Sequence, residues 1–220
     1  VPFIVRKKDG AFLYSTSDVA TVLYRVERWK ADRALYVVDK RQAGHFAQLF
    51  EVVRLMGVQM QLEHIGFGMV TGADGRPIKT RDGTALTLAS LLDEAEDRAE
   101  AKMREEPLSL DPELARSLRG AVGIGAVKYA DLMQNRTSDY KFDWDKLIAF
   151  SGNAGPYIQY MHARCCSLFR KCEVDPKTLL GDFRFVHERD QALARHLLKL
   201  SDAIHSAAEQ SNPHYICQHL

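Results

Sequence analysis

The sequence lacks the features that would place it in a membrane or outside the cell. No apolar run approaches the roughly 20 residues that a membrane-spanning helix needs. The opening stretch, VPFIVRKKDG, has its charges after the apolar residues, which is unlike a signal peptide. The four cysteines, two of them adjacent, do not make a disulfide framework. These absences predict a cytoplasmic protein in a reducing compartment, without a membrane partner.

The sequence also lacks an excess of charge of either sign. Its 30 Lys and Arg stand against 29 Asp and Glu, giving a formal net charge of +1. This balance neither indicates nor excludes a nucleic-acid partner, because a basic face can be balanced elsewhere on the surface. With 220 residues, 46% of them hydrophobic, the chain can build one large domain or two modest ones.

Several short catalytic and metal-binding motifs are missing. There is no Gly-x-Ser-x-Gly elbow, no P-loop and no Gly-x-Gly-x-x-Gly. Gly123 and Gly125 lie inside a helical pattern, which favours close helix packing over phosphate binding. The stretch HARCCSLFRKC has no Cys-x-x-Cys pair, and adjacent residues on a helix point about 100° apart. HYICQH, near the end of the chain, is equally weak, so we predict no metal bound tightly by the protein.

The first third of the chain alternates strand and helix patterns. Apolar residues on both sides of Asp9 and Gly10 predict a hairpin over residues 3–16. Ser15 and Asp18 have the capping-box spacing for a helix that follows. A buried parallel strand, an amphipathic helix and another strand are predicted over residues 33–39, 43–57 and 62–72. This order is typical of an α/β fold with a parallel sheet and crossover connections.

After residue 84 the pattern becomes helical. Helices are predicted over residues 86–105 and 112–133, the second with Asp111 as its cap and Pro112 at its first position. From Gly152 onward the sequence again reads as a series of helices. The chain is therefore predicted to be α/β first and all-α afterwards.

A basic loop precedes the first of these helices. The stretch GRPIKTRDGT, residues 75–84, carries Lys79, Thr80 and Arg81. A helix N-terminus offers unpaired N–H groups and a partial positive charge, and these cations add to it. Such a loop suits a phosphate, above all one that leaves during phosphoryl or nucleotidyl transfer. The spacing alone leaves open that the loop is only a solvated basic turn.

Three polar residues follow strand patterns. Tyr14 and Asp18, four residues apart around a helix start, could hold a cationic group where α/β sheets place their ligands. Gln42 follows YVVDKR and could bind an ammonium or carboxylate group through its amide. The alternatives are that Asp18 only caps its helix and that Gln42 is an ordinary loop residue.

Four stretches together resemble the arginyl-tRNA synthetases. They follow the family's order and cover nearly the whole chain: GAFLYSTSDVATVLYR, YVVDKRQAGHFAQLFEVVRLMG, FGMVTGADGRPIKTRDGTALTLASLLDEA and GAVKYADLMQNRTSDYKFDWDKLIAFSGNAGPYIQYMHAR. The third looks like that family's version of the class I signature loop, which departs from Lys-Met-Ser-Lys-Ser. The resemblance implies a two-step reaction, in which arginine and ATP form arginyl-adenylate and the tRNA then accepts the arginyl group.

The resemblance also implies roles for the residues already singled out. Asp18 would pair with the substrate guanidinium, with Tyr14 beside it, and Gln42 would bind the α-amino end. Lys79 and Arg81 would act in catalysis, and together with Thr80 they would bind ATP. Magnesium is expected to accompany ATP. For the tRNA, the resemblance implies a binding surface made by Asn153, Tyr157, Gln159 and Tyr160.

The implied organisation is the second half of a Rossmann-like catalytic domain followed by an all-α bundle. Residues 1–72 would belong to the catalytic domain, 73–150 to the signature loop and connecting helices, and 151–220 to the start of the anticodon-binding domain. A His-Ile-Gly-His type motif does not occur before Tyr14, so we expect a fragment that does not activate arginine alone. Another class I synthetase or a nucleotidyltransferase is one alternative, and a non-catalytic RNA-binding or regulatory relative is another.

Overall fold

The structure is a computed structural model that falls into two compact units. It describes residues 2–72, 75–76, 87–105, 111–149, 151–179, 181 and 184–220. Unit 1 comprises Val1–Met69 and Arg136–Asp139, and unit 2 comprises Val70–Asn135 and Tyr140–Leu220. No helix in these described ranges is long and apolar enough to cross a membrane.

Unit 1 is built on a strand–helix–strand crossover. Its elements are α1 (Tyr14–Trp29), β1 (Arg33–Asp39), the 3₁₀ turn η1 (Lys40–Gln42), α2 (Ala43–Leu55) and β2 (Gln61–Phe67). The two strands pair in parallel, with Arg33 opposite Gln61 and Asp39 opposite Phe67. The parallel strand predicted over residues 33–39 and the helix after it are confirmed. The strand predicted over residues 62–72 is only partly right, because β2 ends at Phe67.

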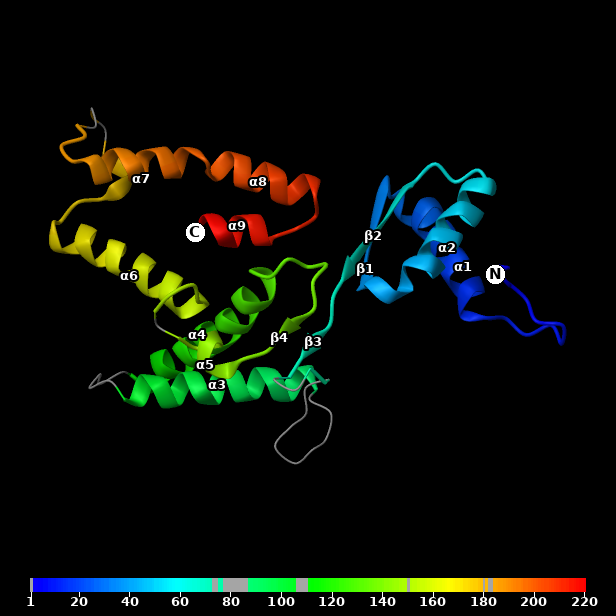
Figure 1. Ribbon diagram of the computed structural model, residues 1–220, viewed down its shortest axis with the longest axis horizontal. Coiled ribbons are helices and arrows are strands. Elements are labelled where there is room, and N and C mark those ends of the chain that lie inside the picture. The colour runs from blue at the N-terminus through cyan, green and yellow to red at the C-terminus, as the bar shows by residue number, and fades with distance from the viewer. Residues whose placement is uncertain are drawn as a thin grey trace. The chain divides into compact units, whose positions relative to one another are not determined.

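Both helices of unit 1 lie on the same side of the strand pair (Figure 1). Val22 of α1 and Leu49 and Val53 of α2 form the centre of a buried core. Side chains alternate along a strand, so Tyr36 and Val38 pack onto this core. The residues on the other face of β1 are exposed, with 65% of Val37 accessible.

The segment before α1 is a tight turn tied to the helix start rather than a full hairpin. Its backbone makes one antiparallel bridge, between Arg6 and Phe12. The turn itself is as predicted, because Gly10 has a φ of +87°, which favours glycine. The predicted Ser15–Asp18 capping box is wrong: α1 begins at Tyr14, and the Ser15 hydroxyl donates to the Ile4 carbonyl at 2.5 Å.

A short segment from much later in the chain completes unit 1. Residues Arg136–Asp139, which we call the strap, run beside the carboxyl end of β2. The Gly68 N–H donates to the Arg136 carbonyl at 2.7 Å, and the Met69 N–H donates to Asp139 Oδ1 at 2.7 Å. Lys40 Nζ lies 2.9 Å from the same carboxylate oxygen. The hydrogen bond from Met69, followed by Lys40, lowers the pKa of Asp139.

Unit 2 is mainly helical. Its elements are β3 (Val70–Thr71), α3 (Leu88–Arg104), α4 (Pro112–Leu132), β4 (Tyr140–Lys141), α5 (Trp144–Leu147), α6 (Gly155–Lys171), η2 (Pro176–Thr178), α7 (Glu188–Leu198), α8 (Leu200–Glu209) and α9 (His214–His219). The cap at Asp111 is confirmed, since its carboxylate accepts from the Glu113 and Leu114 N–H groups. The short parallel pair of β3 with β4 was not predicted from the sequence.

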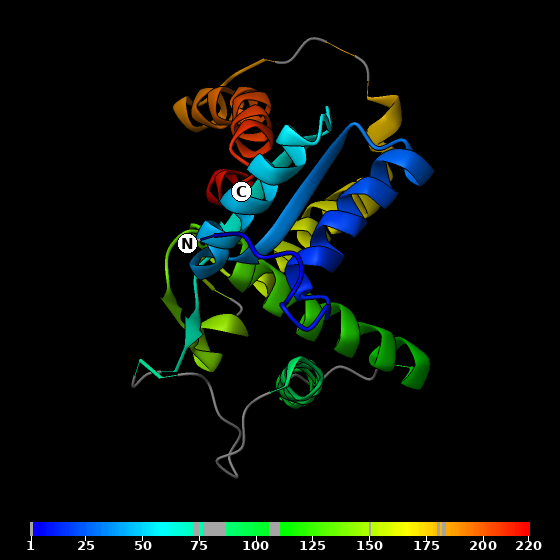
Figure 2. The same ribbon diagram turned by 90° about the vertical axis from the view of Figure 1, so that its right-hand side faces the viewer.

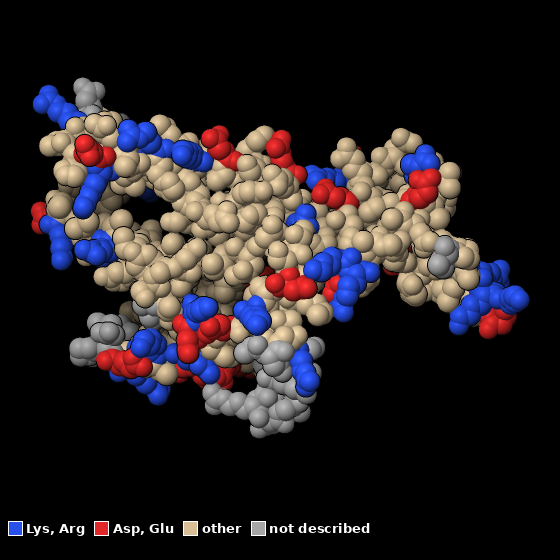
Figure 3. Space-filling model, in the orientation of Figure 1, with Lys and Arg blue, Asp and Glu red and all other residues tan. Residues whose placement is uncertain are grey.

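Helices α3 and α4 pack side by side (Figures 1 and 2). A Cβ added to Gly123 would lie 2.8 Å from the Ala95 backbone, so the helices approach too closely for a larger residue. The prediction that Gly123 serves helix packing is confirmed. Arg119 of α4 lies 2.8 Å from Asp97 of α3. On the face seen in Figure 3, basic and acidic side chains are interspersed along α3.

We predict that Gly68→Ala loosens the strap. An added Cβ would lie 2.2 Å from the Ser138 carbonyl oxygen, and overpacking of this kind costs about 1–3 kcal/mol. The free energy of unfolding should fall, and hydrogen exchange at the Met69 N–H should accelerate. Gly44→Ala is the matched control: its Cβ would meet nothing within 4 Å, and it lies in a helix, so stability should hold or rise. Equal behaviour of the two variants would contradict this account of the strap.

Candidate active site

Two helix starts bring Tyr14, Asp18 and His45 together in unit 1. Asp18 lies one turn beyond Tyr14 on α1, and His45 lies in the first turn of α2. His45 Nε2 is 2.8 Å from Asp18 Oδ2, and the rings of His45 and Tyr14 have centroids 5.0 Å apart. A phenol, a carboxylate and an imidazole therefore share one site, two of them at the predicted positions.

The Asp18 carboxylate is directed sideways to α2 rather than back to its own helix end. Its side chain is 37% exposed, whereas that of His45 is 16% exposed. The alternative that Asp18 only caps α1 is therefore wrong. A carboxylate has about four lone-pair positions, and one hydrogen bond to His45 leaves others to accept from a cationic ligand.

The connection from β1 to α2 carries Gln42, the third residue predicted to bind arginine. Asp39 ends β1, and its carboxylate accepts from the Arg41 N–H at 2.8 Å, which caps the turn η1. The Arg41 guanidinium also binds this carboxylate, with Nη2 2.7 Å from Oδ2. Gln42 ends the turn and is exposed. It is the N-cap of α2 and precedes His45 by three positions, and within the described part of the chain the structure shows no contact between it and Tyr14, Asp18 or His45.

Sequence reasoning missed His45. The residue stands in the stretch RQAGH, three positions beyond Gln42, at a helix start that follows a buried strand. That position is itself a signal, because α/β sheets place ligands beside the carboxyl ends of their strands. Asp18 and His45 are 27 residues apart in the sequence, so no local pattern predicts their contact.

The basic loop cannot be placed in this site. Lys79, Thr80 and Arg81 lie outside the described residues. The helix that follows them, α3, begins at Leu88, and its cap is Thr87, whose hydroxyl accepts from the Ser90 N–H at 3.1 Å. The role of the loop remains a prediction from the sequence.

The four residues predicted to bind tRNA lie at or near the start of α6. Asn153 and Gln159 already make contacts inside unit 2: Asn153 Oδ1 accepts from the Tyr129 hydroxyl, and Gln159 Nε2 donates to the Ala121 carbonyl at 2.9 Å. Tyr157 is half-buried, whereas Tyr160 is half exposed, three residues further along the helix. Tyr160 is thus the more accessible of the two aromatic residues.

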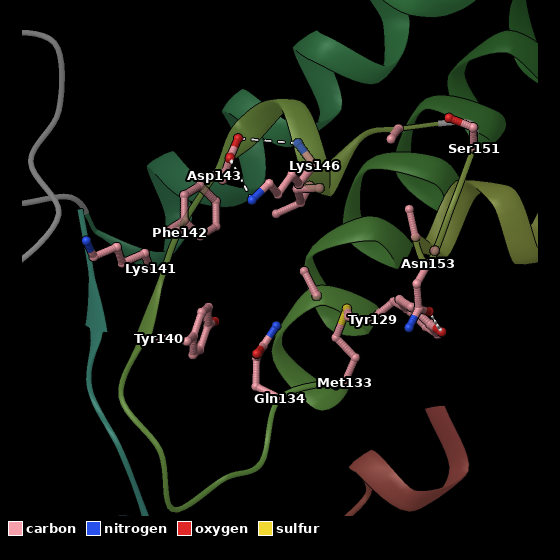
Figure 4. Close-up of a pocket in the computed structure, with 15 residues that line it drawn as sticks. Tyr129, Met133, Gln134, Tyr140, Lys141, Phe142, Asp143, Lys146, Ser151 and Asn153 are labelled. Atoms are coloured by element: carbon pink, nitrogen blue, oxygen red, sulfur yellow. Dashed lines mark hydrogen bonds and ion pairs between the residues drawn. The ribbon is translucent and has the colours of Figure 1, made fainter. Parts of the chain in front are cut away.

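A cavity of about 280 Å³ lies in unit 2 between α4, β4, α5 and the start of α6 (Figure 4). Of the predicted tRNA-binding residues, only Asn153 lines it. Two tyrosines also form part of its wall. Burial raises the pKa of Tyr140, whose hydroxyl donates to Asp131 at 2.9 Å, and burial also raises the pKa of Tyr129. These hydroxyls are therefore neutral hydrogen-bonding groups.

The cysteines and histidines form no cluster in the described part of the chain that could hold a metal ion. A set of three or more His, Cys, Asp or Glu in suitable proximity does not occur among those residues. Cys166 Sγ lies 3.6 Å from His162 Nε2, one helical turn away.

Comparisons with known proteins define the class. The family described as tRNA synthetases class I (R), catalytic domain, matches residues 1–144. The DALR anticodon binding domain matches residues 158–220. The chain therefore belongs to the class I (R) tRNA synthetase family, and the resemblance noted in its sequence is confirmed.

Among curated proteins, the chain is similar to arginine–tRNA ligases. The chain is 46% identical to the one from Alcanivorax borkumensis, covering 100% of this chain and 38% of the relative. It is 47% identical to one from Pseudomonas putida, with coverages of 100% and 39%. The chain thus spans somewhat over a third of the length of these curated relatives.

Solved structures of the same class share the fold. Arginyl-tRNA synthetase from Plasmodium falciparum matches with a TM-score of 0.82 and 27% identity, over 100% of this chain and 38% of that one. The Thermus thermophilus enzyme has a TM-score of 0.80 and 22% identity, over 99% of this chain and 40% of that one. The predicted fold class, an α/β part followed by a helical part, is confirmed.

We predict that Asp39 titrates at an unusually low pH. Its hydrogen bonds from the Arg41 side chain, and then from the Arg41 backbone, lower its pKa to about 2. Because this folded-state pKa lies below the unfolded value of about 3.9, the stabilisation is complete above that value and is lost as the pH falls toward 2. Carbon-detected NMR titration of the Asp39 carboxyl measures it. Arg41→Ala should return the pKa toward its ordinary value, and an Asp39 midpoint near 4 in the unmodified chain would contradict the assignment.

Proposed function

We propose that this chain forms the second half of the catalytic domain and the start of the anticodon-binding domain of an arginine–tRNA ligase. The observation that carries the proposal is its identity of about 46% to such ligases over its whole length, across both family domains. The enzyme would join arginine to ATP, forming arginyl-adenylate and pyrophosphate, and would then pass the arginyl group to its tRNA.

Arginine would bind at the site around Asp18. Its guanidinium is planar and always charged, so a carboxylate is its natural partner. Asp18 would accept from that group, and Tyr14 would lie along it. Gln42, exposed at the end of η1, would bind the α-amino end. The proposal is supported by the contact that brings Asp18 and Tyr14 to one histidine.

ATP would be bound in part by the loop that carries Lys79, Thr80 and Arg81. Adenylate formation needs no protein nucleophile, because the arginine carboxylate itself attacks the α-phosphate. The protein must position the reactants and stabilise charge as pyrophosphate leaves, and the two loop cations suit that task. Magnesium would arrive as the counter-ion of ATP.

The tRNA would contact the helical region. We propose the boundaries 1–72, 73–150 and 151–220 for the catalytic part, the connecting part and the start of the anticodon-binding domain. Tyr157 and Tyr160 are the aromatic residues in the proposed contact, where unpaired bases could stack. Asn153 and Gln159 would contribute the hydrogen-bonding groups that their contacts in unit 2 leave available.

We predict that Asp18→Asn sharply raises the KM for arginine in the full-length enzyme that contains this chain. The substitution keeps the shape and removes the charge, and losing one partner of a desolvated ion pair costs about 2–5 kcal/mol. ATP–pyrophosphate exchange at varied arginine concentration measures the effect. Glu27→Gln, an exposed change on the same helix, should leave the KM unchanged. An unchanged KM in Asp18→Asn would remove the basis for placing arginine here.

We predict that Lys79→Ala and Arg81→Ala lower kcat for exchange more than they raise the KM for ATP. The negative charge that these side chains would meet grows as pyrophosphate leaves, so they would act mainly on the transition state. The expected loss for one such donor is about 10²–10³-fold. Lys79→Arg, which keeps the charge, should recover part of the rate. A change confined to the KM would instead indicate binding of ATP in its ground state.

A further inference from the structure

His45 is held in a fixed orientation at the site. Its ring stacks near Phe3, with centroids 5.8 Å apart, and meets the edge of Phe46 at 5.3 Å. Tyr14 covers it at 5.0 Å. With its side chain only 16% exposed, the imidazole has little freedom to turn away from Asp18.

In the hydrogen bond between His45 and Asp18, the donor and the acceptor can be assigned. A carboxylate can only accept hydrogen bonds, so His45 Nε2 must carry the proton that it shares with Asp18 Oδ2 at 2.8 Å. The bond runs between α1 and α2 and fixes one oxygen of the carboxylate. The Asp18 side chain is still 37% exposed, so a ligand can reach the carboxylate that His45 holds.

We propose that His45 is a positioning residue that holds the Asp18 carboxylate ready for the guanidinium group of arginine. The inference rests on the proposed function, in which Asp18 binds that group. An aspartate that rotates freely must be ordered when the ligand binds, whereas one already held by His45 is not. A histidine suits this task better than arginine or lysine would, because a permanent cation beside Asp18 would compete with the substrate guanidinium.

Two substitutions of similar polarity separate this role from simple packing. His45→Gln keeps an N–H donor near the position of Nε2, whereas the shorter side chain of His45→Asn cannot reach Asp18. In the full-length enzyme, we expect His45→Asn to raise the KM for arginine about tenfold, the cost of ordering one side chain on binding. His45→Gln should restore a KM within about threefold of the unmodified enzyme. The KM for ATP should not change in either variant.

The chain offers a matched control in His64. This second histidine of unit 1 also contacts Phe46, stacking on its ring with centroids 5.0 Å apart, but its Nε2 lies 3.2 Å from the Val38 carbonyl instead of Asp18. His64→Asn should therefore disturb packing to a similar degree and leave the KM for arginine unchanged. Because a KM does not depend on how much of the enzyme is folded, partial misfolding of any variant cannot imitate the expected result.

A double-mutant cycle decides whether His45 acts through Asp18. If it does, adding His45→Asn to Asp18→Asn should raise the KM for arginine no further. Additive effects, or an unchanged KM in His45→Asn alone, would overturn the role of His45 while leaving the proposed function intact. An unchanged KM in Asp18→Asn alone would instead overturn the part of the proposed function that places arginine at Asp18, so the two failures are distinguishable.

Discussion

The parallel pairing of β1 with β2 is the constraint on which the arrangement of unit 1 depends. Parallel strands cannot be joined by a tight turn, so the chain must cross from one end of the pair to the other through α2. That crossover buries Leu49 and Val53 against the strands. It also places the carboxyl ends of both strands at one edge, so that the start of α2 and the strap stand where β1 and β2 end. The chain turns only at the ends of these buried strands and helices. The turns lie at the surface, so polar residues are found there.

The periodic parts of this fold could be predicted from the sequence. The run RALYVVD is long and apolar enough to indicate a buried strand, and the pattern after Gly44 indicates a helix with one apolar face. Asp111 and Pro112 correctly predicted the start of α4. A capping residue and the first residue of a helix interact only with neighbours a few positions away, so the sequence alone identifies them. The pairing of β3 with β4 could not be found in this way, although Val70–Thr71 lies inside the strand predicted over residues 62–72. Each strand is two residues long, and their pairing joins segments that are far apart in the chain.

The candidate site likewise has a part that local sequence pattern predicts and a part that only the folded structure shows. Tyr14 and Asp18 could be paired from the sequence because one helical turn separates them. His45 could not be joined to them, because that contact exists only once α1 and α2 pack on the same side of the strands. The mistaken cap has the same origin. Ser15 has the spacing of a capping residue, but its hydroxyl is satisfied by the Ile4 carbonyl, which the tight turn before α1 brings back to the helix start.

The strap gives the two units an interleaved order along the chain. The polypeptide completes most of unit 1, runs through β3, α3 and α4 of unit 2, returns to unit 1 for Arg136–Asp139, and then goes back to unit 2. No single crossover point in a gene could therefore exchange unit 1 intact between relatives. A recombinant joined between Met69 and Arg136 would combine the Lys40 of one parent with the Asp139 of another. Residues on the strap and at the carboxyl ends of β1 and β2 are thus dispersed in the sequence, yet their contacts depend on one another.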